Sequence, residues 1–372
     1  MLMTLNGHLH FSVMQFTELS QELKDLIFKV LAQFYILPPN KEFVKFKQIG
    51  QNRGYNSAIH KLSLEDGRSY AIKITDNEEH PVLNLLHNRE LEFYEWLDGV
   101  RSETDCEQED LENILQFFGG TRCDTEPGVL ILNDLSSRVG IQPSYTIGYT
   151  PQLVFQIVKQ IAGYQSVYLC AEKEVSVGKE MIKYDLPVQK ALPKLDEVPW
   201  MTEEEKRHLR EWTLPQNLFS IHTEIPDEIE GVSPVLAHCD LWNGNMIFEQ
   251  KEDSTHLLAI LDWQIFKIGN PLIDIATIIG ENMTTEDRRE YTEAILSLYL
   301  NEIEKRKSRF KKRFEMTKDK ARLLLSLALR WPCIQTMFAV VLNPIDDPKE
   351  EDQEMGRLSI RLRELMNDVI GK

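Results

Sequence analysis

Apolar residues recur at helical spacing near the start of the chain and then follow a strand-like pattern up to about residue 132. Over 17–35, leucine, isoleucine and valine stand three to four positions apart, which predicts an amphipathic helix that ends before Pro38. The acidic segment 98–112 is poor in apolar residues and is expected to be a loop. The remaining pattern predicts five strands and one helix: strands over 43–49, 56–64, 69–75, 115–121 and 128–132, and a helix over 82–97.

From residue 151 onward the spacing of apolar residues is helical almost throughout, with helices expected over 151–168, 202–212, 285–308, 317–342 and 352–369. Short strands with one helix, followed by a long helical region, predict an α+β fold with two lobes. The N-lobe is a small antiparallel β-sheet with one main helix, and the C-lobe is large and mostly helical. The predicted parts are an N-terminal helical extension at 1–40, the N-lobe at 41–135 and the C-lobe at 136–372.

Composition narrows the class of protein. The chain has 372 residues, 42% of them apolar and 27% charged, as is typical of globular proteins. Its formal net charge of -17 argues against a nucleic-acid-binding protein, which would carry a concentrated basic face. The basic run 305–313 is the exception, and we interpret it as a solvated helix end or linker in preference to a partner-binding patch.

The cysteines and the N-terminal residues indicate a reducing compartment. The chain has five cysteines, and none of them forms a C-x-x-C pair. The first residues lack the cationic start and apolar run of a secretory leader, and no stretch reaches the roughly 18 apolar residues of a membrane span. We therefore expect a cytoplasmic protein without a membrane span, and the sequence leaves its oligomeric state open.

The most informative segment is 235–245. Its apolar start leads into His238, Asp240 follows two residues later, and Asn245 comes five residues after that. A second apolar run then leads to Asp262. This is the layout of a kinase catalytic loop and its metal-binding aspartate. We predict that Asp240 orients a substrate hydroxyl and accepts its proton, and that Asn245 and Asp262 bind Mg²⁺.

Two further residues are expected to support this loop. His238 is predicted to brace it by hydrogen bonding, with a direct acid–base role as the lesser alternative. Asp274 precedes an apolar helical run, and a buried carboxylate there would bond the backbone of the catalytic loop. Both roles are structural, with consequences for function.

In the N-lobe, Lys73 stands in the alternating run Tyr70-Ala-Ile-Lys-Ile74. A lysine on the third strand of a kinase N-lobe pairs with ATP phosphates and needs a carboxylate partner from the following helix. Glu90 is the preferred partner, and Glu92 is a nearby rival. Each of these residues also has an ordinary interpretation as a solvated side chain on a strand or helix.

The turn between the first two strands, residues 50–57, contains two glycines. Gly50 and Gly54 would let the backbone approach phosphates, and Ser57 would donate a hydroxyl hydrogen bond. The segment lacks a full G-x-G-x-x-G, so an ordinary hairpin turn is an equal alternative.

The adenine ring is expected to meet backbone groups from Leu132 to Leu135, at the junction of the lobes. Asp134, between them, caps the next segment or acts near the substrate, and capping is preferred.

Together these motifs resemble the aminoglycoside phosphotransferase and choline kinase superfamily. His238-Cys-Asp-Leu-Trp-Asn-Gly-Asn245 is similar to the H-G-D-L-W-x-x-N of its choline-kinase-like branch, which includes ecdysteroid kinases and many uncharacterised nematode proteins. Ile260-Leu-Asp-Trp-Gln264, with Gly269-Asn-Pro and Asp274, resembles I-D-W-Q…G-N-P…D, and residues 87–94 match the N-R-E…Y helix. The resemblance runs from about residue 40 to 280, and it implies a two-lobed protein-kinase-like fold.

Three positions depart from that pattern. Cys239 replaces the glycine of the catalytic loop, Gln165 stands where the family often has histidine, and Asn133 replaces an acidic residue of an E-D-L motif. None of the three removes a group needed for phosphoryl transfer. Cys239 would lower activity if the loop needs glycine for its backbone angle.

The resulting hypothesis is a kinase that uses ATP and Mg²⁺ to phosphorylate the hydroxyl of a small molecule, with the acceptor pocket formed by the helices of 151–236 and 285–372. A protein kinase is disfavoured because D-F-G and A-P-E are absent and Trp-Gln follows Asp262. The other alternative is a catalytically weak or inactive kinase-like protein that binds nucleotide or a partner.

Overall fold

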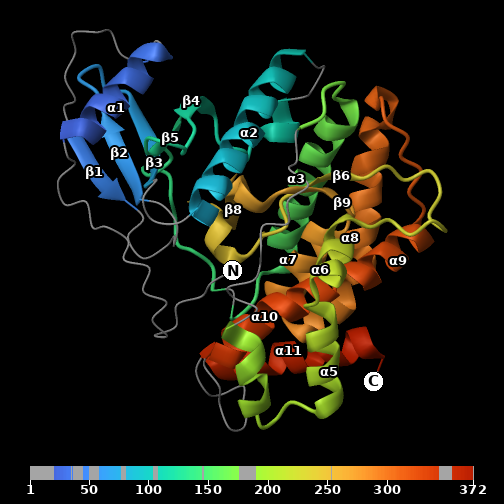
Figure 1. Cartoon of the computed structure of the whole chain (residues 1–372). Helices are drawn as coiled ribbons and strands as arrows, with labels where there is room; N and C mark the ends of the chain where they lie inside the picture. The colour runs from blue at the N-terminus through green and yellow to red at the C-terminus, as the bar shows by residue number, and fades with distance from the viewer. Residues whose placement is uncertain are drawn as a thin grey trace.

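The computed structural model of the chain describes residues 21–34, 36, 45–49, 58–76, 81–103, 108–144, 146–175, 190–252, 254–342 and 354–371. Gly50, Gly54 and Ser57 lie outside these residues, so the predicted phosphate loop stays a prediction. Figure 1 shows a sheet-containing lobe beside a larger, mostly helical one.

The N-lobe is built on a five-stranded antiparallel sheet with the strand order β1-β2-β3-β5-β4. Its strands are β1 (Lys45–Ile49), β2 (Ala58–Ser63), β3 (Ser69–Thr75), β4 (Phe117–Thr121) and β5 (Gly128–Asn133). Helix α1 (Gln21–Gln33) packs its apolar side chains against one face, where Ile27 and Leu31 share a core with Ile72 and Ile131. Helix α1 falls within the predicted extension 1–40, but its apolar side chains belong to the hydrophobic core of the N-lobe sheet.

Helix α2 (Pro81–Glu103) links the sheet to the second lobe. It runs past the predicted end at residue 97, and a short 3-10 turn, η1 (Gln108–Leu111), follows it. The prediction of a loop over 98–112 was therefore wrong at both ends. Val100 and Leu111 are buried in the main core, and these two apolar contacts hold an otherwise acidic segment in helical form.

Helices make up most of the C-lobe, and those predicted over 151–168, 202–212, 285–308 and 352–369 are confirmed. The helices of this lobe are α3 (Pro151–Cys170), η2 (Leu192–Glu197), α5 (Glu203–Trp212), α6 (Pro215–Thr223), α7 (Ile273–Glu281), α8 (Thr285–Arg306), η5 (Lys307–Arg309), α9 (Lys318–Ala328), α10 (Arg330–Leu342) and α11 (Glu354–Ile370). Helix α3 begins at a Thr150 cap followed by proline. It packs along α8 and also contacts η1 and α7, which makes it the central helix of the lobe.

The single helix predicted over 317–342 is two helices that meet at Leu329. Pro332 lies in the first turn of α10, where a missing backbone N–H costs no hydrogen bond. Over the described residues, only the stretch Lys318–Leu342 is long and apolar enough to cross a membrane by length and composition. Most of it is buried against other helices, and the core helices of globular proteins meet the same criterion.

Two short pairs of antiparallel strands, the second of them a hairpin, carry the motif residues of this lobe. Strand β6 (Val235–Ala237) pairs with β9 (Lys267–Gly269), and β7 (Met246–Lys251) pairs with β8 (Ser254–Ile260). Strand β7 begins directly after Asn245, and β8 ends two residues before Asp262. The β7–β8 hairpin therefore brings Asn245 and Asp262 to the same end of the hairpin.

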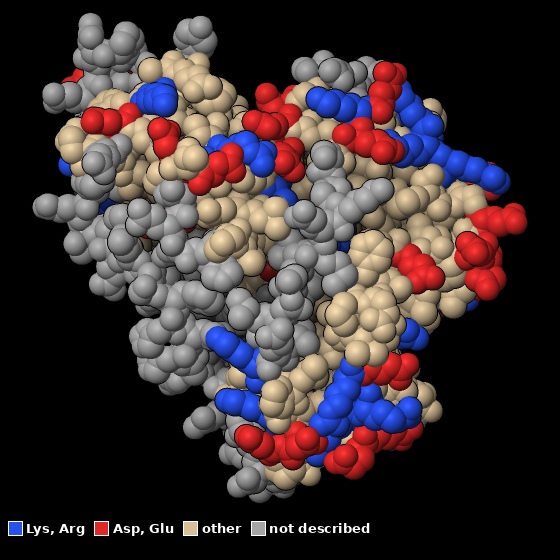
Figure 2. Space-filling model, viewed as in Figure 1, with Lys and Arg blue, Asp and Glu red and all other residues tan. Residues whose placement is uncertain are grey.

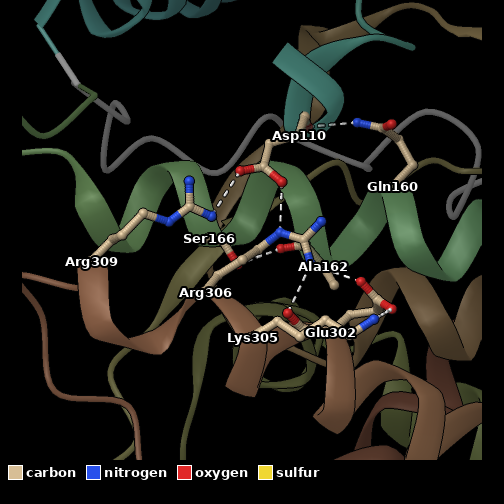
Figure 3. Close-up of polar contacts among 8 residues, drawn as sticks. All are labelled: Asp110, Gln160, Ala162, Ser166, Glu302, Lys305, Arg306 and Arg309. Carbon is tan, nitrogen blue, oxygen red and sulfur yellow. Dashed lines mark hydrogen bonds and ion pairs between the residues drawn. The ribbon is translucent and has the colours of Figure 1, made fainter. Parts of the chain in front are cut away.

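Charged side chains of the C-lobe lie both on its surface and in a largely buried network around Asp110. On the face seen in Figure 2, the described lysines, arginines, aspartates and glutamates are interspersed, without a continuous basic surface. Below the surface, the Asp110 carboxylate accepts hydrogen bonds from Arg306 at 2.6 Å and Arg309 at 3.2 Å, and Arg306 also pairs with Glu302 at 2.8 Å (Figure 3). The interpretation of 305–313 as a solvated segment was thus wrong for these two arginines.

The same network ties three elements together. Gln160 of α3 donates to the Asp110 backbone carbonyl at 2.7 Å (Figure 3). Asp110 thereby joins η1 to α3 and to the end of α8, and only 2% of its side chain is exposed.

Candidate active site

An ion-pair triad joins the two lobes. Nζ of Lys73, on β3, lies 2.6 Å from Oε2 of Glu90 on α2 and 2.6 Å from Oδ1 of Asp262 beyond β8. Burial by itself would lower the pKa of Lys73, but the charges of Asp262 and Glu90 outweigh it and raise that pKa above its ordinary value. The lysine therefore stays charged at neutral pH.

Of the two candidate carboxylates on α2, Glu90 is the one that contacts Lys73. The Glu92 carboxylate instead accepts a hydrogen bond from Arg122 at 3.0 Å. Burial raises the pKa of Glu90 to about 6, because the nearby Lys73 offsets only part of the cost of desolvation. The geometry thus distinguishes two glutamates that the sequence pattern left as rivals.

Asp240 is held from two sides. Nδ2 of Asn245 donates to Oδ2 of Asp240 at 2.9 Å, and Nε2 of Gln335 donates to Oδ1 at 3.0 Å. Each carboxylate oxygen has two lone pairs, so neither of these bonds uses up the acceptor capacity of its oxygen. Because the Asn245 amide nitrogen is used by Asp240, its amide oxygen is the atom left for a metal ion.

Asp274, the second residue of α7, bonds the backbone of the catalytic loop. Its Oδ2 accepts from the His238 N–H at 2.8 Å and from the Tyr164 hydroxyl at 2.6 Å, and its Oδ1 accepts from the Cys239 N–H at 2.8 Å. Burial raises the pKa of Asp274 against the stabilising effect of these bonds. These contacts are those that a bracing role requires, and the effect on activity stays a prediction.

His238 joins the catalytic loop to the segment that ends at Asp262. Its Nδ1 accepts from the Asp240 N–H at 3.2 Å, which leaves Nε2 to donate to the Leu261 carbonyl at 2.8 Å. The Leu261 N–H donates to the Asn245 carbonyl at 2.8 Å. With both ring nitrogens bonded to backbone groups, the histidine is placed to hold the loop, and its effect on activity stays a prediction.

The donor set around Asp262 fits a magnesium ion. Its Oδ2 accepts from Gln264 at 2.8 Å and its Oδ1 from Lys73 at 2.6 Å, and a carboxylate oxygen with one such bond has a second lone pair that can bind a metal ion. Among the described residues no group of three or more His, Cys, Asp or Glu could hold a metal. A site with one carboxylate and one amide oxygen suits Mg²⁺, which keeps waters and substrate phosphates as its other ligands.

The junction of the lobes carries the residues expected near adenine. Leu132 lies in β5 and pairs with Ala71 of β3, and Leu135 follows the strand, where its carbonyl accepts from the Arg138 N–H at 2.9 Å. Asp134 accepts from the Ser136 N–H at 2.9 Å, as a capping residue does. Burial would raise the pKa of Asp134, but its hydrogen bonds, including one from Lys61, lower it to about 2.

Several polar residues at this site lie outside the recognised motifs. Gln335 lies 95 positions after Asp240, and Tyr164 lies 110 positions before Asp274. Gln142 donates to the Asn243 carbonyl at 2.8 Å and thereby fixes the linker between the lobes to the catalytic loop. Buried glutamine within a predicted apolar helix is the one local sign that would have drawn attention to Gln335.

Gln165, one of the departures from the family pattern, is fully engaged. Its amide nitrogen donates to the Pro271 carbonyl at 3.0 Å, and its amide oxygen accepts from the Tyr299 hydroxyl at 2.7 Å. Glutamine therefore serves as a buried link between α3, α8 and the segment before α7.

Cys239, the departure beside the catalytic aspartate, has a φ of 66° and is completely buried. This left-handed backbone region is where glycine is favoured, since a Cβ there costs roughly 1–2 kcal/mol. The loop therefore keeps the backbone angle of a glycine while carrying a thiol.

Replacing Cys239 by glycine is expected to leave a more stable protein than replacing it by alanine, by about 1 kcal/mol in the free energy of unfolding. The comparison removes the thiol in both variants and changes only the Cβ. At Cys333, inside α10, the same pair should show the reverse order, with alanine favoured by about 1 kcal/mol. Urea unfolding of the four variants checks this, and the same order at both positions would contradict it.

Comparisons with known proteins give the family of the chain and related proteins. A family model described as DUF1679, Uncharacterized oxidoreductase dhs-27, matches residues 57–371. A 4-hydroxytryptamine kinase from Psilocybe cyanescens is 33% identical over 60 residues, which cover 16% of this chain and 17% of that protein. The Uncharacterized oxidoreductase dhs-27 of Caenorhabditis elegans is 28% identical over 127 residues, which cover 32% of this chain and 15% of that protein. The chain thus spans less than a fifth of either relative.

A solved structure extends the comparison to the whole fold. A protein provisionally identified as an aminoglycoside phosphotransferase from Ralstonia eutropha superposes with a TM-score of 0.53 at 13% identity. The superposition covers 94% of this chain and 98% of that one. At this identity the likeness shows the fold, which is the two-lobed kinase-like fold predicted from the motifs.

Proposed function

Because the chain belongs to the DUF1679 family, within the aminoglycoside phosphotransferase superfamily, we propose that it is a kinase that phosphorylates a hydroxyl of a small molecule. One observation carries the proposal: the Lys73–Asp262 contact joins the two lobes beside the loop between β6 and β7, which carries Asp240 and Asn245. The relative named 4-hydroxytryptamine kinase, which by that name acts on a small molecule, supports the acceptor class.

In the proposed reaction, the acceptor hydroxyl donates a hydrogen bond to the Asp240 carboxylate. As its oxygen bonds to the terminal phosphorus of ATP, the bond from that phosphorus to the ADP oxygen breaks, and the hydroxyl proton passes to Asp240. Lys73, aligned by Glu90, holds the phosphates through its ammonium group. Asp274 and His238 keep Asp240 at a constant position relative to Asp262.

Mg²⁺ would be held by Asp262 and Asn245, and it supplies charge neutralisation of the phosphates when bound. ATP, Mg²⁺ and the cytoplasmic location all belong to the proposal. The acceptor pocket is proposed to lie among the helices of 151–236 and 285–372, where Asp240 faces the C-lobe helix α10.

The name of the Caenorhabditis elegans relative describes an oxidoreductase, and the matched segment spans 15% of that protein. Dinucleotide-dependent oxidoreductases bind their cofactor on a mostly parallel sheet with helices on both faces. Over the described residues, the five-stranded sheet of this chain is antiparallel throughout. The described sheet of this chain therefore lacks the parallel arrangement on which such cofactors bind.

A catalytically weak or inactive nucleotide-binding protein is the second candidate, and the left-handed backbone of Cys239 is the observation that favours it. In that case MgATP would raise the melting temperature through binding alone, without transfer to any acceptor. Turnover that Cys239→Gly increases would identify an enzyme slowed by its loop.

Lys73→Met is expected to weaken MgATP binding about 10- to 100-fold, because it removes a charge-assisted contact to the phosphates. Isothermal titration of MgATP into the purified protein checks this. Lys206→Met is the matched control, since Lys206 is also a mostly buried, ion-paired lysine, at 7% side-chain exposure, on α5. Equal affinities in both variants and the wild type would contradict the proposed nucleotide site.

A further inference from the structure

Helix α10 contacts the catalytic loop at two successive residues. Nε1 of Trp331 donates to the Cys239 carbonyl at 3.0 Å, and Nε2 of Gln335 donates to Oδ1 of Asp240 at 3.0 Å. The two donors are four positions apart and therefore lie on one face of the helix, one turn from each other. This face holds both the backbone of the loop and the carboxylate that follows it.

The bond from Gln335 complements the one from Asn245. The Asp240 carboxylate only accepts hydrogen bonds, so the Gln335 side chain must point its amide nitrogen, and not its oxygen, toward Asp240. Gln335 fixes Oδ1 and Asn245 fixes Oδ2, and together the two amides set the rotation of the Asp240 carboxylate plane. Asn245 belongs to the same loop as Asp240, whereas Gln335 fixes the carboxylate relative to the C-lobe helices.

Packing alone does not account for glutamine at this position. Gln335 is 1% exposed, and its Oε1 is buried without a hydrogen-bond partner among the described residues. A buried, unsatisfied polar oxygen costs about 1–3 kcal/mol, a cost that an apolar side chain of the same size avoids. The donated N–H is what glutamine contributes here, and its recipient is Asp240.

We propose that Gln335 is a positioning residue for phosphoryl transfer: it orients the Asp240 carboxylate toward the acceptor hydroxyl from α10. The inference rests on the proposed kinase function. It extends that function into the C-terminal helices, which carry none of the recognised motifs. Misplacement of a reacting group by about 1 Å can cost on the order of 100-fold in rate, so the loss of this bond has a measurable effect.

The test compares Gln335→Met, which keeps the length but donates nothing, with Gln335→Glu, which places a second carboxylate against Asp240. Transfer of labelled phosphate from MgATP to a cell metabolite extract is measured at a fixed amount of extract. We expect the saturated rate to fall about 10- to 100-fold for Met and further for Glu, because like charges repel. The KM for MgATP is expected to stay within about twofold of wild type for both variants.

Gln160→Met is the matched control, because Gln160 is likewise a buried glutamine, at 4% exposure, that donates one hydrogen bond, to the Asp110 carbonyl (Figure 3). It should lower the melting temperature without lowering the saturated rate. A wild-type rate in Gln335→Met, or a loss of rate that Gln160→Met matches, overturns the positioning role.

If Gln335→Met does not fold, Trp331→Phe replaces it, with a reduced rate expected and a wild-type rate overturning the inference. Absence of transfer by the wild-type protein itself overturns the proposed function instead.

Discussion

Asp240→Asn is expected to lower the rate of phosphoryl transfer by about 1,000-fold or more while leaving MgATP binding nearly unchanged. Proton acceptance by a positioned carboxylate contributes roughly 100- to 10,000-fold to such reactions, and an amide cannot accept the hydroxyl proton. The substitution keeps the shape of the side chain, and Gln335 can still donate to its remaining oxygen. The affinity for MgATP is therefore the quantity that separates a lost base from a misfolded site.

Asp98→Asn is the control for this variant, since Asp98 is an exposed carboxylate on α2. Its rate and its MgATP affinity should both equal those of the wild type. Titration calorimetry and the rate of labelled phosphate transfer give the two quantities on the same preparations. A rate for Asp240→Asn within about tenfold of wild type would remove Asp240 from the role of proton acceptor.

Asp110→Asn is expected to destabilise the protein by about 3 kcal/mol, because it leaves two arginines without the carboxylate that they share. Arg306 is 11% exposed and Arg309 is 21% exposed, so solvent does little to replace the lost partner (Figure 3). Glu302 still pairs with Arg306, which keeps the expected loss at the lower end of the range for broken buried ion pairs. Chemical unfolding followed by far-ultraviolet circular dichroism measures the change.

An exposed ion pair supplies the comparison for Asp110. Asp319 pairs with Arg322 at 2.9 Å on α9, and its side chain is 90% exposed. Asp319→Asn should change the free energy of unfolding by no more than about 0.5 kcal/mol. A loss for Asp110→Asn as small as that would show that the network in Figure 3 does not stabilise the junction of η1, α3 and α8.

The strands nearest to the motifs could be predicted from the sequence because the residue pattern that indicates each strand lies within the strand itself. Alternation over Tyr70–Ile74 indicated β3, and the apolar run before Asp262 indicated β8. The apolar helical run that begins around Asp274 was enough to expect a buried carboxylate there that bonds the catalytic loop. The signals for these elements and for Asp274 therefore lie in the residues next to them in the sequence.

The parts that could not be predicted depend on contacts between distant segments. Gln335 reaches Asp240 only because α10 packs against α7 and α6, and apolar spacing does not tell which face of a buried helix meets which loop. The ends of the segment 98–112 are helical because Val100 and Leu111 enter a core built largely from later residues. The inward turn of Arg306 and Arg309 likewise depends on where Asp110 lies.

The central claim is that this chain transfers the terminal phosphoryl group of ATP to a small-molecule hydroxyl. The most direct measurement incubates the wild-type protein and Asp240→Asn with γ-labelled MgATP and a cell metabolite extract, followed by mass spectrometry of the small molecules. The account predicts a labelled phosphate ester that requires both Mg²⁺ and the wild-type protein and is lost with Asp240→Asn. No labelled small molecule with the wild-type protein, or equal labelling with both proteins, would contradict the account.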